Sequence, residues 1–288
     1  MNKKFLIATN YFFIATILIL GFIGCQKMDR PALGKYLQDA NPPGGPLKFY
    51  AAFDGTTSNP LMNAVDSIRA NFPSANPFTA VAGISGKAVQ GVSGMAINYP
   101  SANDFKYATS FTIAFWVKTT GVPKSADGPQ FVFSLVQNNY SWHNSVIFLL
   151  FDHNGAGSTV DSAAISFALK DNWYVFHKGD RIPKLYDQQW HHLAFVYDET
   201  TSLLTTYADG KALVVSAAAS SQTGVKGPLN FTTTDIANLV IGGWNTHAGL
   251  NGATGGWIQS YPGAIDQFRM YGKVLSAAEI QSLYNNKQ

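Results

Sequence analysis

Hydrophobic and polar residues alternate along most of the chain after Leu47, which is the pattern of half-buried β-strands. The run from Phe111 to Lys118 is the clearest example. Successive side chains of a strand point to opposite faces, so one face of this run carries Phe111, Ile113, Phe115 and Val117. The pattern predicts that this face belongs to the core of a β-sheet.

Further strand-like runs follow one another between clusters of Gly, Asn, Asp and Pro. These runs are Leu47–Phe53, Met95–Tyr99, Phe131–Val136, Val146–Phe151, Ala163–Leu169, Trp173–Phe176, Trp190–Tyr197, Leu203–Ala208, Lys211–Ser216, Leu239–Ile241 and Ala264–Tyr271. Asp209 and Gly210 separate two of them and favour a type I′ hairpin turn, because both positions need positive φ. Many short strands and few helices predict an all-β protein, a jelly-roll sandwich of two antiparallel sheets.

Two short helices are expected. Near the C-terminus, Ser276 and Glu279 have the spacing of a capping box, which predicts that a short helix begins there. Between Phe53 and Ile84, apolar residues recur at helical spacing and predict one short helix before Pro73. Those residues are Leu61, Ala64, Val65 and Ile68.

The N-terminus has the pattern of an export signal. Lys3 and Lys4 precede an uncharged run from Phe5 to Gly24, and Cys25 follows as the only cysteine. This order predicts a signal peptide over residues 1–24, although an apolar run of about 20 residues is also long enough to remain as a membrane anchor. Both interpretations tether the protein to a membrane. One cysteine allows no disulfide, so the exported part depends on its core for stability.

Residues 25–46 are polar and rich in Pro and Gly, which favours an extended tether before a single domain over residues 47–288. Loss of residues 1–24 removes Lys3 and Lys4 from 20 basic residues and leaves 18 against 17 acidic ones. A net charge of +1 favours no polyanionic partner, and we expect no binding of nucleic acid.

Several segments resemble known families. Phe22–Cys25 is similar to a bacterial lipobox, which implies lipidation of Cys25 and an outer-membrane lipid as a partner. The tether resembles those of lipoproteins in Gram-negative glycan-uptake systems, which implies a place at the cell surface. The domain resembles the laminin-G-like domain of the concanavalin A-like lectin/glucanase superfamily in Phe53–Gly55, Gly86–Val89, Ser110–Lys118, Trp190–Asp198, Leu203–Leu213 and Pro262–Tyr284. That resemblance implies a jelly roll.

The same resemblance implies one structural Ca²⁺ between the first and last strands, held by Asp54 and Asp266. Six to eight oxygen ligands would be needed, the others from carbonyls and water. The alternative is that Asp54 starts a turn and that Asp266 pairs with a Lys or Arg.

Catalytic residues are not indicated. Jelly-roll glycanases need a pair of carboxyl groups, usually glutamates close together on one strand, and this chain has only Glu199 in a loop and Glu279 at a helix start. Most aspartates lie in turn-like contexts that explain them without catalysis, including Asp54, Asp127, Asp152, Asp180 and Asp209. His191 and His192 are adjacent in a strand, so they point to opposite faces, one packed and one exposed, and no transition-metal site is expected.

Aromatic residues in loops indicate a saccharide site, because sugars offer apolar faces and hydroxyl rims. The loop around 137–144 offers Tyr140, Trp142 and His143, and the Gly-rich loop 242–262 offers Trp244, Asn245, His247, Trp257 and Tyr261. Trp173 is a further candidate, or else it starts a buried strand. The alternative for the loop aromatics is that they fold down over the edge of the sandwich.

These observations favour a non-catalytic lipoprotein at the cell surface that binds an oligo- or polysaccharide for capture and uptake. A protein-binding adhesion or scaffold module is the alternative, and a glycoside hydrolase with a pair of aspartates ranks last.

Overall fold

The computed structural model describes residues 45–137, 146–231 and 236–287, which belong to a compact unit over residues 41–288. The predictions for the signal peptide, for Cys25 and for nearly all of the tether lie outside these residues. The same holds for Tyr140, Trp142 and His143.

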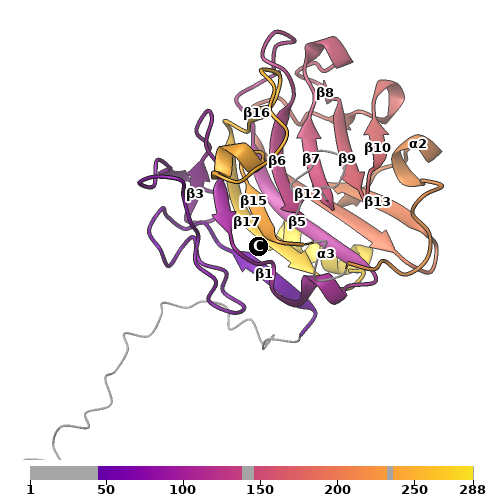
Figure 1. Cartoon of the computed structure of the whole chain (residues 1–288). Coiled ribbons are helices and arrows are strands. Elements are labelled where there is room, and N and C mark those ends of the chain that lie inside the picture. Colours follow the sequence, from indigo (N-terminus) through magenta and orange to yellow (C-terminus); the bar gives the residue numbers. More distant parts are fainter. Residues whose placement is uncertain (1–44, 138–145, 232–235, 288) are drawn as a thin grey trace, which may run out of the picture. The chain divides into compact units, whose positions relative to one another are not determined.

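The predicted two-sheet sandwich is confirmed (Figure 1). The larger sheet has eight strands in the order β14-β13-β12-β5-β17-β3-β2, and β1 also pairs with β17. Their bounds are β14 Lys211–Ala212, β13 Leu203–Ala208, β12 Trp190–Asp198, β5 Phe111–Lys118, β17 Ala264–Tyr271, β3 Lys87–Gln90, β2 Thr79–Ala82 and β1 Leu47–Ala51. The positive φ angles of Asp209 and Gly210, 50° and 77°, agree with the tight turn predicted between β13 and β14.

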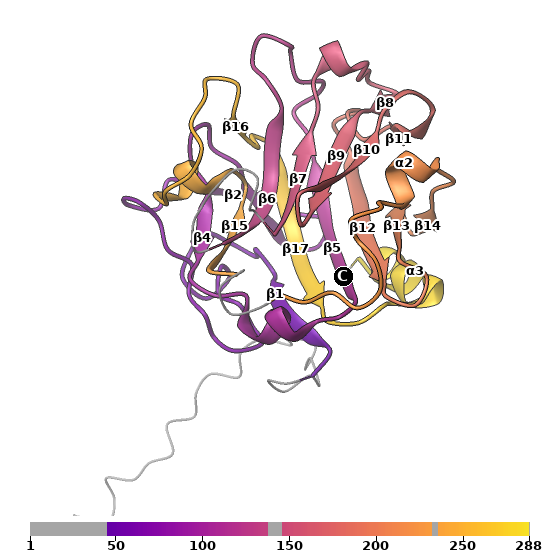
Figure 2. The same cartoon turned by 45° about the vertical axis from the view of Figure 1, so that its right-hand side comes forward.

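The smaller sheet has seven strands in the order β10-β9-β7-β6-β15-β4, and β16 pairs in parallel with β6 (Figure 2). Their bounds are β10 Asn172–Phe176, β9 Ile165–Leu169, β7 Ile147–Phe151, β6 Gln130–Val136, β15 Asn238–Ile241, β4 Ile97–Tyr99 and β16 Gln259–Ser260. A two-stranded pair, β8 (Ser162–Ala163) and β11 (Ile182–Pro183), lies beside this sheet.

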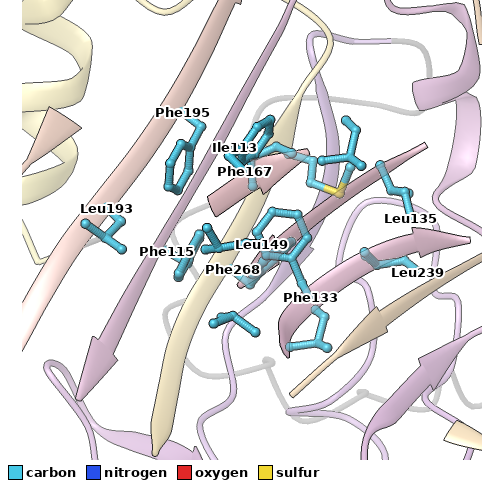
Figure 3. Close-up of a cluster of buried hydrophobic side chains, with 14 of the residues drawn as sticks. Ile113, Phe115, Phe133, Leu135, Leu149, Phe167, Leu193, Phe195, Leu239 and Phe268 are labelled. Carbon is cyan, nitrogen blue, oxygen red and sulfur yellow. The ribbon is translucent and has the colours of Figure 1, made fainter. Parts of the chain in front are cut away.

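The core lies between the two sheets and is largely aromatic (Figure 3). Phe115 of β5, Phe133 of β6 and Phe268 of β17 have ring centroids 5.3 to 5.7 Å apart, so they join both layers. Each ring is fully buried. Alternation along the strands accounts for most of these inward positions, and bulges in β6 and β17 shift the pattern so that Phe133 and Phe268 also point into this space.

The outer face of the larger sheet is covered by α3 (Ala277–Asn285). Ser276 and Glu279 form the predicted capping box, so the helix begins where the sequence indicated. Ile280 packs on Ala114 of β5 and Val196 of β12, whose side chains lie on the outer face of the sheet. The outer faces of the two sheets are therefore different environments.

The helix predicted before Pro73 is wrong, because residues 61–68 form turns. The Asn63 side chain accepts hydrogen bonds from the backbone N–H groups of Tyr50 and Val65, and Asp66 accepts one from Ile68. Such bonds offer the backbone an alternative to helical pairing. Ser67, at φ 62°, also has a conformation that a right-handed helix does not allow.

Strands β2, β3, β11 and β16 and the short helix α2 (Ala217–Ser220) were not predicted from the sequence. Within the described ranges, no helix is both long and apolar enough to cross a bilayer.

Candidate functional site

The outer face of β7, β9 and β10 carries the candidate site. Leu149 and Phe167 point into the core, so the residues directly before and after each of them point outward. The register places Ser166 beside both Leu150 and Val175, and Ala168 beside Phe148 and Trp173. We call the outward-facing residues of this region the outer strip: Phe148, Leu150, Asp152, Ser166, Ala168, Trp173, Val175 and His177.

One end of the outer strip is polar and centres on Asp152. Its Oδ2 accepts a hydrogen bond from Ser166 Oγ at 2.9 Å and lies 3.0 Å from His177 Nε2. Its carbonyl oxygen accepts bonds from the hydroxyls of Ser158 and Tyr186. The carboxylate is therefore fixed in position, with 14 % of its side chain exposed, and the His177 side chain is 36 % exposed.

The order of these three groups is not that of a catalytic triad. A triad places the imidazole between the hydroxyl and the carboxylate, so that it can take the hydroxyl proton. Here Asp152 lies between Ser166 and His177. The arrangement can accept and donate hydrogen bonds, but it does not activate Ser166.

The other end of the outer strip is aromatic. The rings of Phe148 and Trp173 meet edge to face at a centroid distance of 5.1 Å, and Trp244 meets Phe148 in the same way at 5.8 Å. Phe148 is buried beneath them, whereas Trp173 is partly exposed. Trp173 thus presents an aromatic surface at the end of the strip that lies away from Asp152.

The Gly-rich loop after β15 covers the neighbouring part of this face. Trp244 is fully buried, packs on Phe131 at 4.7 Å and donates its indole N–H to the Ala253 carbonyl. The prediction of an exposed Trp244 platform is therefore wrong, because the outer face of β6 is itself apolar and binds the ring. The alternative weighed from the sequence, that loop aromatics fold down over the sandwich, applies to this residue.

Two neighbours in the loop support Trp244 rather than face solvent. Asn245, also predicted to bind sugar, is fully buried and its Oδ1 lies 3.3 Å from Ser134 Oγ. His247 is partly buried, and its Nδ1 accepts a hydrogen bond from the Trp244 N–H. Burial lowers the pKa of His247, which agrees with a neutral ring acting as acceptor.

Tyr261 and Trp257 differ sharply in exposure. Tyr261 is fully buried in the main core beside Phe151. The prediction that it contacts a sugar at the surface is therefore wrong. Its side chain points between the sheets, just before β17 begins. Trp257 is 46 % exposed at the rim of the loop. Of the candidates in the described residues, Trp173 and Trp257 therefore offer accessible aromatic surface, and only Trp173 lies on the outer strip.

Sequence reasoning missed Asp152 and His177 as a pair. The sequence pattern indicates a turn at Asp152, and nothing in it places His177 beside that residue. The signal was the alternation itself: Asp152 follows Phe148 and Leu150 on one face of β7, and His177 follows Trp173 and Val175 on β10. Asp152 and His177 lie side by side because β7 and β10 both flank β9 in the sheet.

Asp54 and Asp266 lie against the same hairpin turn, between β2 and β3. Asp54 Oδ1 accepts a hydrogen bond from the Lys87 N–H, and Asp266 Oδ2 accepts one from the Ile84 N–H. A Cβ at Gly83 or Gly86 would lie within 2.5 Å of these carboxylates, so glycine is needed for the close approach. The first and last parts of the domain thus meet at this turn.

Asp266 is an unusual carboxylate. It is fully buried, and its Oδ1 has no hydrogen-bond partner in the described structure. Burial, with a smaller effect of the Asp54 charge, raises the pKa of Asp266 to about 7. The expected alternative, a pair with Lys or Arg, is not seen within 4.0 Å among the described residues. Nor do those residues contain a cluster of three or more His, Cys, Asp or Glu side chains suited to a metal.

His191 and His192 point to different surroundings, but the expectation that one is exposed is wrong. His191 is 7 % exposed and lies 2.9 Å from both Asp187 Oδ1 and Asp209 Oδ2. His192 is buried beside Trp116 under α3, at a ring distance of 5.1 Å. Burial lowers the pKa of His192 to about 3, so this ring is neutral.

Comparison with solved structures supports the fold. The chain is similar to domain 4 of AbnA, a GH43 extracellular arabinanase from Geobacillus stearothermophilus, solved in complex with arabinotriose (17 % identity, TM-score 0.53, 83 % of this chain and 98 % of that one). It is also similar to the binding domain of botulinum neurotoxin serotype G (14 %, TM-score 0.53, 84 % and 51 %). A third similar structure is a mutant Trypanosoma rangeli sialidase displaying trans-sialidase activity (14 %, TM-score 0.52, 85 % and 33 %). The chain thus spans about half of the toxin domain and a third of the sialidase.

A search of curated proteins gave no match. The laminin-G-type sequence profile described as concanavalin A-like lectin/glucanases superfamily matches residues 93–281, which is well over half of the chain. Together with the two-layered jelly roll, this match shows that the chain belongs to the concanavalin A-like lectin/glucanases superfamily.

Proposed function

We propose that the protein binds an oligo- or polysaccharide on the outer strip without cleaving it. The observation that carries this proposal is the pairing of a partly exposed Trp173 with the fixed Asp152–His177 pair on one sheet face. His177 follows Trp173 by four positions, just after the end of β10, which is a span of roughly 13 Å at about 3.3 Å per residue. An aromatic ring can stack on the apolar face of one sugar while the polar end bonds the hydroxyls of another.

The ligands of similar structures guide the choice of probes. Domain 4 of AbnA was solved with arabinotriose, and a binding domain of botulinum neurotoxin DC was solved in complex with SialylT. Both proteins share less than 25 % identity with this chain, so their ligands suggest a test panel and nothing more. The panel contains arabino-, xylo-, gluco- and galacto-oligosaccharides of three to six units, with neutral and acidic members.

Calorimetric titration of the domain with this panel tests the proposal. We expect a saturable ligand whose affinity falls about ten-fold or more in Trp173→Ala, since loss of one stacking ring costs on the order of 1.4 kcal/mol. Tyr107→Ala is the matched control, because Tyr107 is a 71 % exposed aromatic on η1 (Asn103–Tyr107), outside the outer strip. Equal binding by wild type and Trp173→Ala would place the site elsewhere, with Trp257 as the next residue to test.

The absence of catalysis is part of the proposal. Glycoside hydrolysis uses two carboxyl groups on opposite sides of the bond, and Asp152 is the single carboxylate of the outer strip. It is already engaged by Ser166 and His177. Incubation of the domain with the bound saccharide should release no new reducing ends, and Asp152→Asn should change affinity rather than turnover. Release of reducing ends that Asp152→Asn abolishes would identify a hydrolase instead.

A structural Ca²⁺ between Asp54 and Asp266 fits the residues present. The buried Oδ1 of Asp266 lacks a partner, and a cation would compensate its charge. Asp54 and Asp266 would supply carboxylate oxygens, with carbonyls and water completing a set of six to eight ligands. The ion would hold the N-terminal part of the domain against β17.

We also propose that the protein is anchored to a membrane by a lipid. Cys25 would be lipidated after removal of residues 1–24, and residues 25–46 would hold the domain away from an outer membrane. Cys25→Ser should move the protein from the membrane fraction to the soluble fraction, as measured by immunoblotting after fractionation. Membrane retention of that variant would favour an uncleaved anchor.

A further inference from the structure

Arg181 is a cation beside the polar end of the outer strip, and it has no charged partner among the described residues. It precedes β11 and is partly buried, and its Nε is inaccessible to solvent and makes no hydrogen bond in the described structure. Among the described residues, no Asp or Glu oxygen lies within 4.0 Å of its guanidinium. A partly desolvated charge without a partner is costly, so such a position favours binding of an anion.

The guanidinium lies against the loop that also holds Asp152. A Cβ at Gly157 would be 2.7 Å from Arg181 Nη1, and Gly157 has a φ of 88°. Ser158, the next residue, donates its hydroxyl to the Asp152 carbonyl, and His177 lies 3.0 Å from the Asp152 carboxylate. Arg181 and His177 therefore both contact the segment from Asp152 to Ser158.

Charges of both signs surround Arg181, and the acidic ones already have partners. Lys178 and Lys184 lie at the two ends of the segment 178–184, which contains Arg181, and both are exposed. The one acidic residue of the segment, Asp180, is already engaged, because its two oxygens accept hydrogen bonds from the N–H and hydroxyl of Ser216. The Asp152 carboxylate at the same end of the outer strip is also engaged, by Ser166 and His177, so the Arg181 guanidinium is the charged donor that an anion would meet there.

From this placement we propose that Arg181 binds the carboxylate of an acidic sugar residue, so that the outer strip selects saccharides with uronic or sialic acid units. The planar guanidinium presents two parallel N–H donors that match the two oxygens of a carboxylate. A neutral residue of the same chain stacks on Trp173, at the other end of the strip. This inference rests on the proposed function, because it names the ligand class of the same site.

Two pairs of probes test the inference on the full domain by calorimetric titration. Trigalacturonic acid is compared with its methyl ester, a pair that differs only in the carboxylates. Sialyllactose is compared with lactose, which lacks the whole sialic acid unit. For wild type, we expect at least one acid to bind about ten-fold or more tightly than its neutral partner. Raising the salt concentration should weaken binding of the acid more than that of the neutral probe.

Variants assign the effect to Arg181. Arg181→Gln should lose the preference for the acid and bind the neutral partner as wild type does. Arg181→Lys keeps the charge but not the fork, so it should recover only part of the preference. Lys184→Gln removes the same charge from an exposed position nearby and should change affinity less than about three-fold.

The outcomes separate this inference from the proposed function. Trp173-dependent binding that is equal for acids and neutral partners would overturn the role of Arg181 and leave saccharide binding intact. An acid preference that persists in Arg181→Gln would also overturn it. If none of the four probes and no member of the wider panel binds, both proposals fail. The comparison of acid with ester uses wild type alone, so it stands even where a variant does not fold.

Discussion

At the scale of single residues, the environment decides what each tryptophan does. Trp244 and Trp257 lie in the same Gly-rich loop, yet one is fully buried and the other is 46 % exposed. Trp244 has Phe131 and Phe148 beneath its ring and a carbonyl within reach of its N–H. A buried indole with a satisfied donor contributes stability rather than ligand contact.

Trp244→Ala should therefore lower the free energy of unfolding by about 3–5 kcal/mol, the usual cost of deleting a large buried aromatic side chain. Urea-induced unfolding followed by fluorescence measures the change. Trp257→Ala is the matched control from the same loop and should stay within about 0.5 kcal/mol of wild type. Similar losses in both variants would contradict the assignment of Trp244 to the packed face.

At the scale of elements, one bridge of three side chains fastens the start of β12. His191 lies between Asp187, in the preceding loop, and Asp209, in the turn between β13 and β14. Burial lowers the pKa of His191, but the hydrogen bonds and charges of Asp209 and Asp187 outweigh it, so the pKa is raised above 6.5. Burial raises the pKa of Asp187 and Asp209, but the hydrogen bonds from His191 and from backbone N–H groups outweigh it, so both pKa values are lowered.

The bridge predicts a defined pH dependence of stability. Because the folded pKa of His191 is raised, its contribution is fully present below pH 6.5 and is lost as the pH rises through the folded value. The aspartates have lowered pKa values, so their contribution is lost when the pH falls below their normal range. His191→Gln should cost about 1 kcal/mol or more at pH 6 and clearly less at pH 9.

Urea unfolding at several pH values between 5 and 9 measures this difference. Other groups near the bridge are Lys184, beside Asp187, and the neutral His192, beside Asp209. Neither forms an ion pair with the bridge within 4.0 Å. A loss in His191→Gln that is the same at pH 6 and pH 9 would show that the ring acts only by packing.

The C-terminal helix offers a second test at this scale. Ser276 accepts a hydrogen bond from the Glu279 N–H, and Glu279 accepts bonds from Ser276 and Lys273. The Lys273 bond and the two Ser276 bonds lower the pKa of Glu279 to about 2. Ser276→Ala should cost about 1 kcal/mol of the free energy of unfolding, whereas Ser282→Ala, in the exposed body of the helix, should cost less. Equal costs in thermal unfolding would argue against the cap.

Most elements could be predicted from the sequence because strand alternation and capping are local. The outer strip could not be predicted, because Asp152 and His177 become neighbours only through the sheet order β10-β9-β7. The burial of Trp244 was missed for the same reason. Its exposure depends on the apolar outward residues of β6 and β7, which a local pattern assigns simply to a strand. The turn at Asn63 shows the reverse case, where local side-chain bonding overrode a helical pattern.

At the scale of the whole molecule, the turn between β2 and β3 connects Asp54, just after β1, with Asp266 on β17. A Ca²⁺ at this point should stabilise the folded domain by about 2.7 kcal/mol at a hundred times its dissociation constant, or roughly 5–10 °C in Tm. Calorimetry with chelator and then with calcium measures this shift. Asp266→Asn should abolish it, whereas Asp127→Asn, in an exposed turn, should not. No shift in wild type would remove the ion from the proposal.

The two ends of the domain and the outer strip lie on different layers of the sandwich. The Pro46 carbonyl accepts a hydrogen bond from Gly272 at the end of β17, so the chain enters on the larger sheet, and Lys287 beside Trp116 shows that it leaves there too. The outer strip lies on the opposite layer. Capture of the domain by an affinity tag at either end, on a sensor chip or a bead, should therefore leave this surface open to molecules in solution.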